Sequence, residues 1–259
     1  MPFAVKSPVI GYNTDTLGHR AKIGVIVPAT NTVVQPEMDA MRPPGVTNHV
    51  SRMFLPPRPY DSMEEYARLL QVEEGDLDSA LKLCLLMEPA VIAHGHSIHS
   101  FRGDVTRGYA EKTALEKKTD VPFWTPSTAV LAALEAIGKP KRIAVLSPYW
   151  PPADEMIANF LRSAGYEVVG SGGLKAKGAT NVARITPEQI REGFRMVDSA
   201  RAEVLVQVGT ALPLSHMTES IEKERGKPVI GVNVATYWAA LRSIGINDRI
   251  VGFGNLLAS

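Results

Sequence analysis

Three histidines, His94, His96 and His99, lie within six residues of this 259-residue chain. They follow a short apolar run, residues 89–92, of the kind that fills a buried strand. Small and polar residues come next, as at the start of a helix. In open α/β sheets, ligands bind where a strand ends in this way. The chain has six histidines in all, so half of them lie at this one candidate site.

The histidine cluster supports three interpretations. If the strand continues through His96, the rings of His94 and His96 point to the same face, as a pair of metal ligands would. No carboxylate-bearing motif supplies the remaining ligands, however, and we assign no metal site. Alternatively, His96 is a general base or a hydrogen-bond donor to a substrate. Under the third interpretation, His94 and His99 are structural histidines that orient the loop.

Other polar residues follow further predicted strands, and Asn181 lies in a Gly-rich loop. Their hydroxyl, amide and backbone N–H groups can bind a carboxylate without Arg or Lys, and the same donors can stabilise an enediolate. The alternative is that Asn31, Ser97 and Thr210 are only helix caps. The candidates at the strand ends are Asn31, Thr32, Gly95, His96, Ser97, Tyr149, Gly209 and Thr210.

Strands and helices alternate along the chain, which predicts parallel sheets covered on both faces. The expected strands are 22–28, 46–55, a strand ending at His94, 121–124, 142–146, 166–169, 204–208 and 229–232. The expected helices are one from about Val33, 62–86, 104–115, 127–138, 153–163, one from Thr186, 215–225 and 235–244, with a loop over 171–181. Capping boxes at Ser62–Glu65 and Thr186–Gln189 mark two of the helix starts.

A faint internal repeat organises these elements. The segment from Ile23 resembles the segment from Ile143, 120 residues later, and the segment from Ala90 resembles the segment from Glu203, 113 residues later. We therefore predict an α/β fold of two similar parallel-sheet halves, related by a pseudo-two-fold axis, with a small-molecule site in the cleft between them. The predicted parts are an N-terminal arm over 1–21, a first half over 22–125 with 232–259, and a second half over 126–231.

Composition excludes several classes of function. The net charge of +1 provides no basic excess for nucleic-acid binding, and no apolar segment reaches the roughly 18 residues that a membrane span needs. No signal peptide, dinucleotide fingerprint or P-loop is present, so we expect a cytoplasmic protein without a cofactor. The single cysteine, Cys84, lies at the apolar end of a predicted helix and is expected to be an inert core residue. The N-terminal arm suggests a contact between subunits of a homo-oligomer.

Several segments resemble a known group of enzymes. Residues 27–32, Val-Pro-Ala-Thr-Asn-Thr, resemble the Val-Pro-Ser-Ser-Asn-Thr segment of maleate cis-trans isomerases. Residues 95–103 resemble the Gly-Thr-Ser … Tyr-Arg-Gly segment of arylmalonate decarboxylases, and residues 127–131 and Tyr149 match as well. The resemblance extends from about Ile23 to Gly252. Both families belong to the aspartate/glutamate racemase superfamily and use no cofactor.

The resemblance implies roles for individual residues. It places Asn31, Tyr149 and Asn181 on a substrate carboxylate, and His96 and Ser97 in a dioxyanion pocket. The family's two catalytic cysteines correspond to Gly95 and Val208, and a valine side chain can neither attack a double bond nor deliver a proton. The predicted catalytic residues are His96 and Tyr149, and the predicted substrate-binding residues are Pro28, Asn31, Thr32, Gly95, Ser97, Tyr149, Asn181, Val208, Gly209 and Thr210.

The expected function is therefore a cofactor-independent isomerase or decarboxylase that acts on a small carboxylate without a catalytic cysteine. Two alternatives remain. One is a metal-dependent or water-using hydrolase of a cyclic amide or similar small acid. The other is a catalytically inactive protein that binds a small acid.

Overall fold

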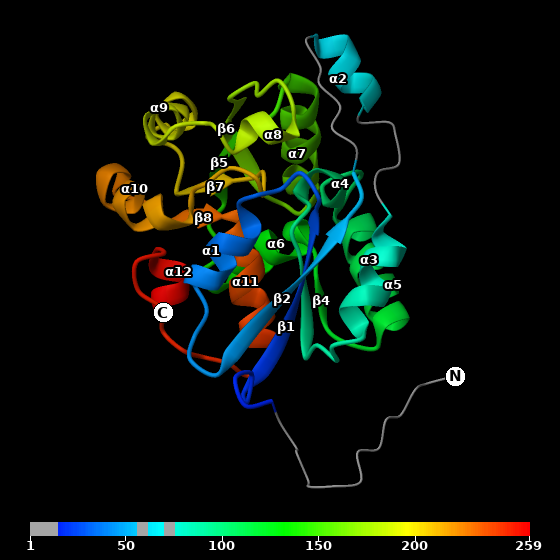
Figure 1. Ribbon diagram of the computed structural model, residues 1–259. Coiled ribbons are helices and arrows are strands. Elements are labelled where there is room, and N and C mark those ends of the chain that lie inside the picture. The colour runs from blue at the N-terminus through cyan, green and yellow to red at the C-terminus, as the bar shows by residue number, and fades with distance from the viewer. Residues whose placement is uncertain (1–14, 56–61, 70–75) are drawn as a thin grey trace, which may run out of the picture.

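The computed structural model describes residues 15–55, 62–69 and 76–259, and Figure 1 shows their arrangement. Eight strands form two parallel four-stranded sheets within this part of the chain. The first sheet contains β1 (Ala21–Pro28), β2 (Val46–Met53), β3 (Val91–His94) and β4 (Phe123–Trp124). The second sheet contains β5 (Arg142–Ser147), β6 (Glu167–Gly173), β7 (Val204–Gln207) and β8 (Val229–Gly231). The α/β fold class is confirmed.

The two sheets repeat one topology. The strand order is β2-β1-β3-β4 in the first sheet and β6-β5-β7-β8 in the second. Ile26 pairs with His94 in the first sheet, and Leu146 pairs with Gln207 in the second. Since 120 residues separate Ile26 from Leu146 and 113 separate His94 from Gln207, the repeat seen in the sequence matches the register of the sheets.

Helices cover the sheets on their faces. They are α1 (Val34–Ala40), α2 (Met63–Leu69), α3 (Leu77–Leu85), α4 (Ser97–Ser100), α5 (Val105–Thr119), α6 (Pro126–Ala136), α7 (Pro151–Ser163), α8 (Ala179–Val182), α9 (Pro187–Val197), the 3-10 turn η1 (Ser215–Met217), α10 (Thr218–Arg225), α11 (Val232–Ser243) and α12 (Asn255–Ala258). Side chains of both sheets share one buried cluster with α6 and α11, which lie centrally in Figure 1. Smaller clusters lie under α3 and α5 on the first sheet and under α9 and α10 on the second.

Local capping explains where several helices begin. Asp104 and Thr125 accept hydrogen bonds from the first turns of α5 and α6, as N-caps do. The predicted capping box at Thr186 is confirmed, because its hydroxyl and the Gln189 side chain each bond the other residue's backbone. At Ser62, the hydroxyl accepts the Glu65 N–H at 3.2 Å.

The structure corrects several expected boundaries. The single helix over 62–86 is two helices, α2 and α3, and residues 70–75 lie outside the described part. Strand β6 continues to Gly173, where a loop was expected, because residues 171–173 pair with β5 despite their glycines. The four-residue helices α4, α8 and α12 were not predicted, since a single turn leaves no periodic apolar pattern.

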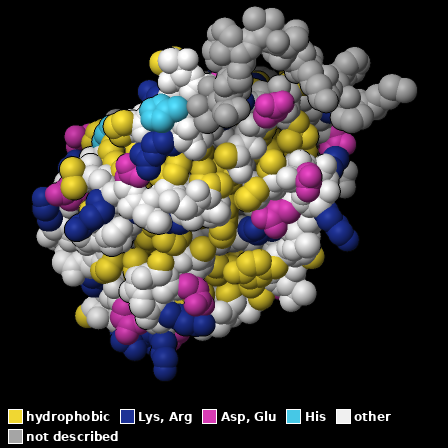
Figure 2. Space-filling view, turned by 90° about the horizontal axis from the view of Figure 1, so that it is seen from below, with side chains coloured by type: hydrophobic (Ala, Val, Ile, Leu, Met, Phe, Trp, Pro, Cys, Tyr) yellow, Lys and Arg dark blue, Asp and Glu magenta, His cyan; other side chains and the backbone are white. Residues whose placement is uncertain are grey.

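No described helix is long and apolar enough to span a membrane. Figure 2 shows basic and acidic side chains interspersed over one face, with hydrophobic side chains between them.

Residues 1–14 of the predicted arm lie outside the described residues. At its end, Arg20 binds both carboxylate oxygens of Asp248 at 2.8 and 2.5 Å.

Candidate functional site

Residues after β1, β3, β5 and β7 converge on one set of hydrogen bonds. Beyond β7, the Thr210 hydroxyl donates to the Gly95 carbonyl at 2.9 Å, and the Thr210 N–H donates to Ser97 Oγ at 3.3 Å. Ser97 Oγ lies 2.9 Å from the Tyr149 hydroxyl, and Asn31 Nδ2 donates to Thr210 Oγ1 at 3.3 Å. We call Asn31, Ser97, Tyr149 and Thr210 the hydroxyl–amide cluster. It joins residues that follow strands of both sheets.

Three of the four cluster residues are buried, and Tyr149 is half-buried. Asn31, Ser97 and Thr210 are each at most 4% exposed. Hydrogen bonds are stronger electrostatically in such surroundings than in water. Ser97 and Tyr149 carry two hydroxyl hydrogens, and the bond between them uses one. Hydroxyl groups of this kind can donate to a carboxylate or enediolate oxygen.

Asn31 has two roles. Its Oδ1 accepts the N–H groups of Val33 and Val34 at 2.9 and 3.0 Å, which caps the start of α1. Its Nδ2 faces Thr210 at the same time. The Arg52 guanidinium also donates to the Asn31 carbonyl at 2.9 Å. This one side chain therefore supports the first turn of α1 and takes part in the cluster, and its contact with a substrate stays a prediction.

Hydrogen bonds to its backbone N–H and carbonyl groups hold Tyr149 in place. Ser147 Oγ accepts the Tyr149 N–H at 2.9 Å and donates to Asp154 Oδ1 at 2.5 Å. The Tyr149 carbonyl accepts the Lys175 N–H at 3.0 Å. Burial raises the pKa of Asp154. The sequence analysis missed Ser147 and Asp154, although their positions, two residues before Tyr149 and in the first turn of α7, could have indicated a capping pair.

Ser97 is fixed by the short helix α4. The Ser100 hydroxyl donates to the Ser97 carbonyl at 2.8 Å and accepts the Ser127 N–H, in the first turn of α6, at 3.1 Å. Ser97 and Ser100 are both buried. The serine-rich stretch therefore packs α4 onto α6 and orients the Ser97 side chain toward Tyr149.

The histidine cluster differs from the geometry assumed for a metal pair. Strand β3 ends at His94, and His96 is the N-cap of α4, so the strand does not continue through His96. The His96 ring centroid lies 6.0 Å from that of His94 and 4.9 Å from that of His99. Within the described residues, no group of three or more His, Cys, Asp or Glu side chains is arranged to hold a metal ion.

Burial keeps two of these histidines neutral near pH 7. It lowers the pKa of His94 to about 4, with a contribution from the charge of His99. It also lowers the pKa of His96 well below its usual value, helped by His99, His94 and Arg102. A neutral imidazole at His96 can donate one N–H, whereas the lowered pKa makes the ring a weaker base than a solvent-exposed histidine.

The positions that the resemblance aligns with family cysteines are tightly packed. A Cβ atom at Gly95 would lie 2.7 Å from Val27 Cγ1 and 2.9 Å from Val34 Cγ1. Val208 is fully buried within the main core. Gly209 has φ +120, and a Cβ there would lie 2.3 Å from Pro148 Cδ. These residues shape the backbone around the cluster rather than supplying reactive groups.

We expect Gly209→Ala to lower the free energy of unfolding by about 2–4 kcal/mol, because it combines a disfavoured φ with a clash against the Pro148 ring. Urea unfolding measures the change. Gly138→Ala is the matched control, since Gly138 also has a positive φ, +99, but a Cβ there meets nothing within 4 Å. Equal losses for the two variants would show that Pro148 does not restrict this position.

The described contacts do not link every predicted residue to the cluster. Asn181 lies in α8, and its Oδ1 accepts from Arg184 at 3.3 Å. Thr32 is exposed, and Asn31 provides the cap instead. Pro28 contributes its carbonyl, which accepts the Asn31 N–H at 2.9 Å. Direct substrate contacts by these residues, and by every other predicted site residue, remain predictions.

Cys84 is a core residue, as expected. It is 2% exposed on α3, and burial raises the pKa of its thiol to about 11. Its Sγ atom occupies the space beside Gly24, where a Cβ would approach to 2.5 Å. A thiol in this state is protonated and inert at neutral pH.

Comparison with known proteins identifies relatives along almost the whole chain. A model of the arylmalonate decarboxylase family matches residues 23–257. The maleate isomerase of Pseudomonas putida is 28% identical over 255 residues, covering 92% of this chain and 97% of its own length. The arylmalonate decarboxylase of Bordetella bronchiseptica is 28% identical over 240 residues, covering 90% and 95%.

Solved structures agree with the fold. The Nocardia farcinica maleate cis-trans isomerase bound to TRIS superposes with a TM-score of 0.80 at 23% identity, covering 92% of this chain and 97% of that one. The maleate isomerase Iso of Pseudomonas putida S16 superposes with a TM-score of 0.78 at 25% identity, covering 92% and 98%. With the family match spanning both sheets and every residue of the hydroxyl–amide cluster, the chain belongs to the arylmalonate decarboxylase family, which groups it with maleate isomerases and arylmalonate decarboxylases.

Proposed function

We propose that this protein is a cofactor-independent decarboxylase or isomerase of a small carboxylate, and that its reaction passes through an enediolate without a catalytic thiol. The observation that carries the proposal is the hydroxyl–amide cluster, in which donors from both sheets meet in buried surroundings. Preorganised neutral donors of this kind stabilise negative charge that develops on an oxygen.

Decarboxylation fits the cluster directly. When the bond between the α-carbon and one carboxylate breaks, carbon dioxide leaves and the electron pair passes into the remaining carboxylate as an enediolate. The hydroxyl hydrogen of the Ser97–Tyr149 pair is donated to an enediolate oxygen. A proton then returns to the α-carbon. Solvent is the proposed source of this proton, and the proposed catalytic role of Tyr149 is to hold the enediolate together with Ser97.

His96 supports proton movement in the same scheme. Its imidazole is neutral at pH 7, because burial, with smaller contributions from His99, His94 and Arg102, lowers its pKa well below the usual value. For a substrate that isomerises by a proton shift, His96 is the proposed base that removes the α-proton. For a decarboxylation, its N–H is the proposed hydrogen-bond donor to the substrate.

The absence of a reactive thiol favours enediolate chemistry over addition to a double bond. A cysteine-to-serine variant of the Nocardia farcinica isomerase was solved with a covalently bound succinylcysteine intermediate. In this chain the single cysteine, Cys84, is buried on α3, and the space beside Gly95 is filled by Val27 and Val34. Covalent addition would therefore need a nucleophile other than a thiol.

Turnover on a panel of substituted malonates, maleate and cyclic amides tests the proposal. We expect carbon dioxide release or isomerisation, and we expect Cys84→Ala to keep the turnover of the wild type, because Cys84 is buried against Gly24. His96→Ala should lower it. Loss of turnover in a folded Cys84→Ala variant would contradict thiol-free catalysis.

The same panel separates the other classes of function. Binding of a carboxylate by calorimetry, without turnover of any compound, would indicate a binding protein. Ring opening of a cyclic amide that depends on added zinc or manganese would indicate a hydrolase. Either result would overturn the proposal.

A further inference from the structure

A buried carboxylate lies behind the hydroxyl–amide cluster and has no part in the proposed chemistry. Glu37, on α1, is 5% exposed. Its Oε1 accepts the Ser215 N–H at 2.8 Å, and its Oε2 accepts Asn233 Nδ2 at 2.7 Å. Burial raises the pKa of Glu37, while the hydrogen bonds from Asn233 and Ser215 oppose that rise. Both carboxylate oxygens of Glu37 therefore accept hydrogen bonds from residues that lie far away in the sequence.

The two donors, Ser215 and Asn233, connect Glu37 to the two ends of one segment, residues 210–215. Ser215 is bound to Glu37 directly. Asn233 Nδ2 donates to Glu37 and also to the Thr210 carbonyl, at 2.9 Å. Glu37 thus holds the segment at both ends, and one end is a member of the hydroxyl–amide cluster.

The acceptor oxygens around Asn233 fix the orientation of its side-chain amide. Its Nδ2 faces two acceptor oxygens, while its Oδ1 is buried without a hydrogen-bond partner among the described residues. A flipped amide would place Oδ1 against the Glu37 carboxylate and the Thr210 carbonyl, where like dipoles repel. Glu37 and the Thr210 carbonyl therefore both select the Nδ2 group of Asn233, and Glu37 anchors that group beside Thr210.

We propose that Glu37 is a positioning residue that acts through Asn233 to set the backbone of Thr210, and with it the N–H and hydroxyl that reach Ser97 and Gly95. The consequence for catalysis rests on the proposed function. The geometry itself does not, because the bonds exist whether or not the protein turns over a substrate. Glu37→Gln removes one acceptor and leaves a donor facing a donor.

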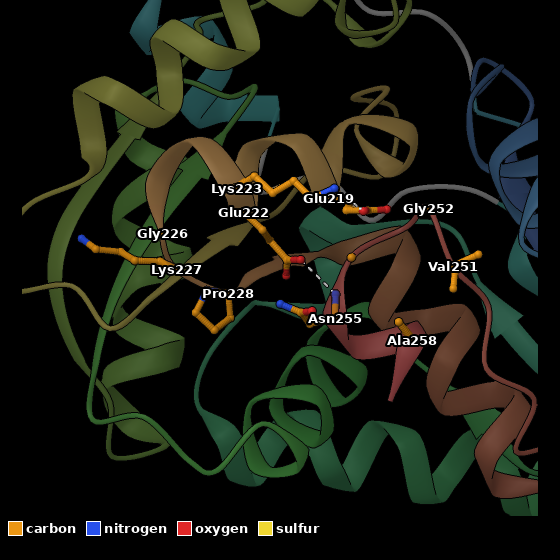
Figure 3. Close-up of a pocket in the computed structure, with 11 residues that line it drawn as sticks. Glu219, Glu222, Lys223, Gly226, Lys227, Pro228, Val251, Gly252, Asn255 and Ala258 are labelled. Atoms are coloured by element: carbon orange, nitrogen blue, oxygen red, sulfur yellow. Dashed lines mark hydrogen bonds and ion pairs between the residues drawn. The ribbon is translucent and has the colours of Figure 1, made fainter.

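Glu222 provides a matched control. It is a buried carboxylate on α10, and it accepts two backbone N–H groups, from Val229 at 3.0 Å and Asn255 at 2.9 Å. Figure 3 shows it in a pocket of about 340 Å³ formed by α10, the turn before β8 and the C-terminal segment. This pocket is lined by none of the cluster residues. Glu222→Gln thus disturbs a comparable buried carboxylate outside the site.

The first measurement needs no ligand. We expect Glu37→Gln to speed backbone hydrogen exchange over residues 210–215 by about 10-fold or more, since the hydrogen bonds that hold the segment weaken. Glu222→Gln should leave exchange there unchanged. Unchanged exchange in the Glu37→Gln variant would overturn the inference, whatever the protein's activity.

The second measurement separates positioning from general stability. In Glu37→Gln with Asn233→Asp, the amide and the carboxylate exchange places, so the bond between them and much of the stability are expected to return. The new carboxylate at position 233 cannot donate to the Thr210 carbonyl, so kcat/KM should stay about 10- to 100-fold below the wild type. If activity recovers together with stability, or if Glu37→Gln leaves kcat/KM unchanged, Glu37 is only structural. A wild type without turnover would count against the proposed function alone, since the exchange result stands separately.

Discussion

Replacing Tyr149 by Phe is expected to lower kcat/KM on the active substrate by about 100- to 1,000-fold, the effect of removing one donor to a developing oxyanion. The substitution removes only the hydroxyl that lies 2.9 Å from Ser97 Oγ. The ring keeps its place, because the Tyr149 backbone is held through Ser147 and Lys175. The loss should therefore appear in activity, with little change in the free energy of unfolding.

Ser97→Ala is expected to lower kcat/KM by a similar factor, because it removes the other hydroxyl of the pair. The double variant should lose little more kcat/KM than either single variant, since the two hydroxyl groups act as one donor. Tyr109→Phe is the control. Tyr109 lies on α5, is 47% exposed, and has no place in the cluster. Fully additive losses, or full activity in Tyr149→Phe, would show that the pair does not act on the substrate.

The fold was predictable because its signals are local and repeated. Each half contains strands that are apolar on both faces, and the repeat offsets of the sequence equal those between Ile26 and Leu146 and between His94 and Gln207. Register in a parallel sheet follows this apolar pattern. Single-turn helices such as α4 were missed because they depend on side-chain bonds, here through Ser100, rather than on a period.

The candidate site was predictable only in part. Strand ends indicated Asn31, Ser97, Tyr149 and Thr210, since the carboxyl edge of a parallel sheet collects polar residues. Glu37 was missed, although a carboxylate on the helix face that carries Val34, Met38 and Met41 is an unusual pattern. Its partners Ser215 and Asn233 lie 178 and 196 residues away, and no local pattern reveals such pairing.

The buried position of His94 is expected to affect the stability of the protein and its dependence on pH. His94 is 6% exposed, and neither of its ring nitrogens has a hydrogen-bond partner among the described residues. Its ring lies against Phe123, with centroids 5.8 Å apart. An unsatisfied buried polar group costs stability, so His94→Leu should leave the free energy of unfolding at pH 7.5 unchanged or raise it by about 1 kcal/mol.

At lower pH the effect of His94 on the free energy of unfolding becomes larger. The pKa of His94 is about 4 in the folded protein and near 6.5 when unfolded, so between these values the unfolded state binds the extra proton. Stability is therefore retained above pH 6.5 and is lost as the pH falls toward 4, by about 2 kcal/mol at pH 5 from this residue. His96 adds a loss of the same sign, because its pKa is also lowered.

His94→Leu should abolish the His94 share of this loss. Urea unfolding at pH 7.5 and pH 5.0 is expected to show a difference about 2 kcal/mol smaller for the variant than for the wild type. His49→Gln, on the exposed surface of β2, is the control and should keep the wild-type difference. A wild-type pH difference preserved in His94→Leu would mean that His94 is solvated or bonded in solution. The proposed neutral state of His96 depends on burial in the same way, so that proposal would lose part of its support.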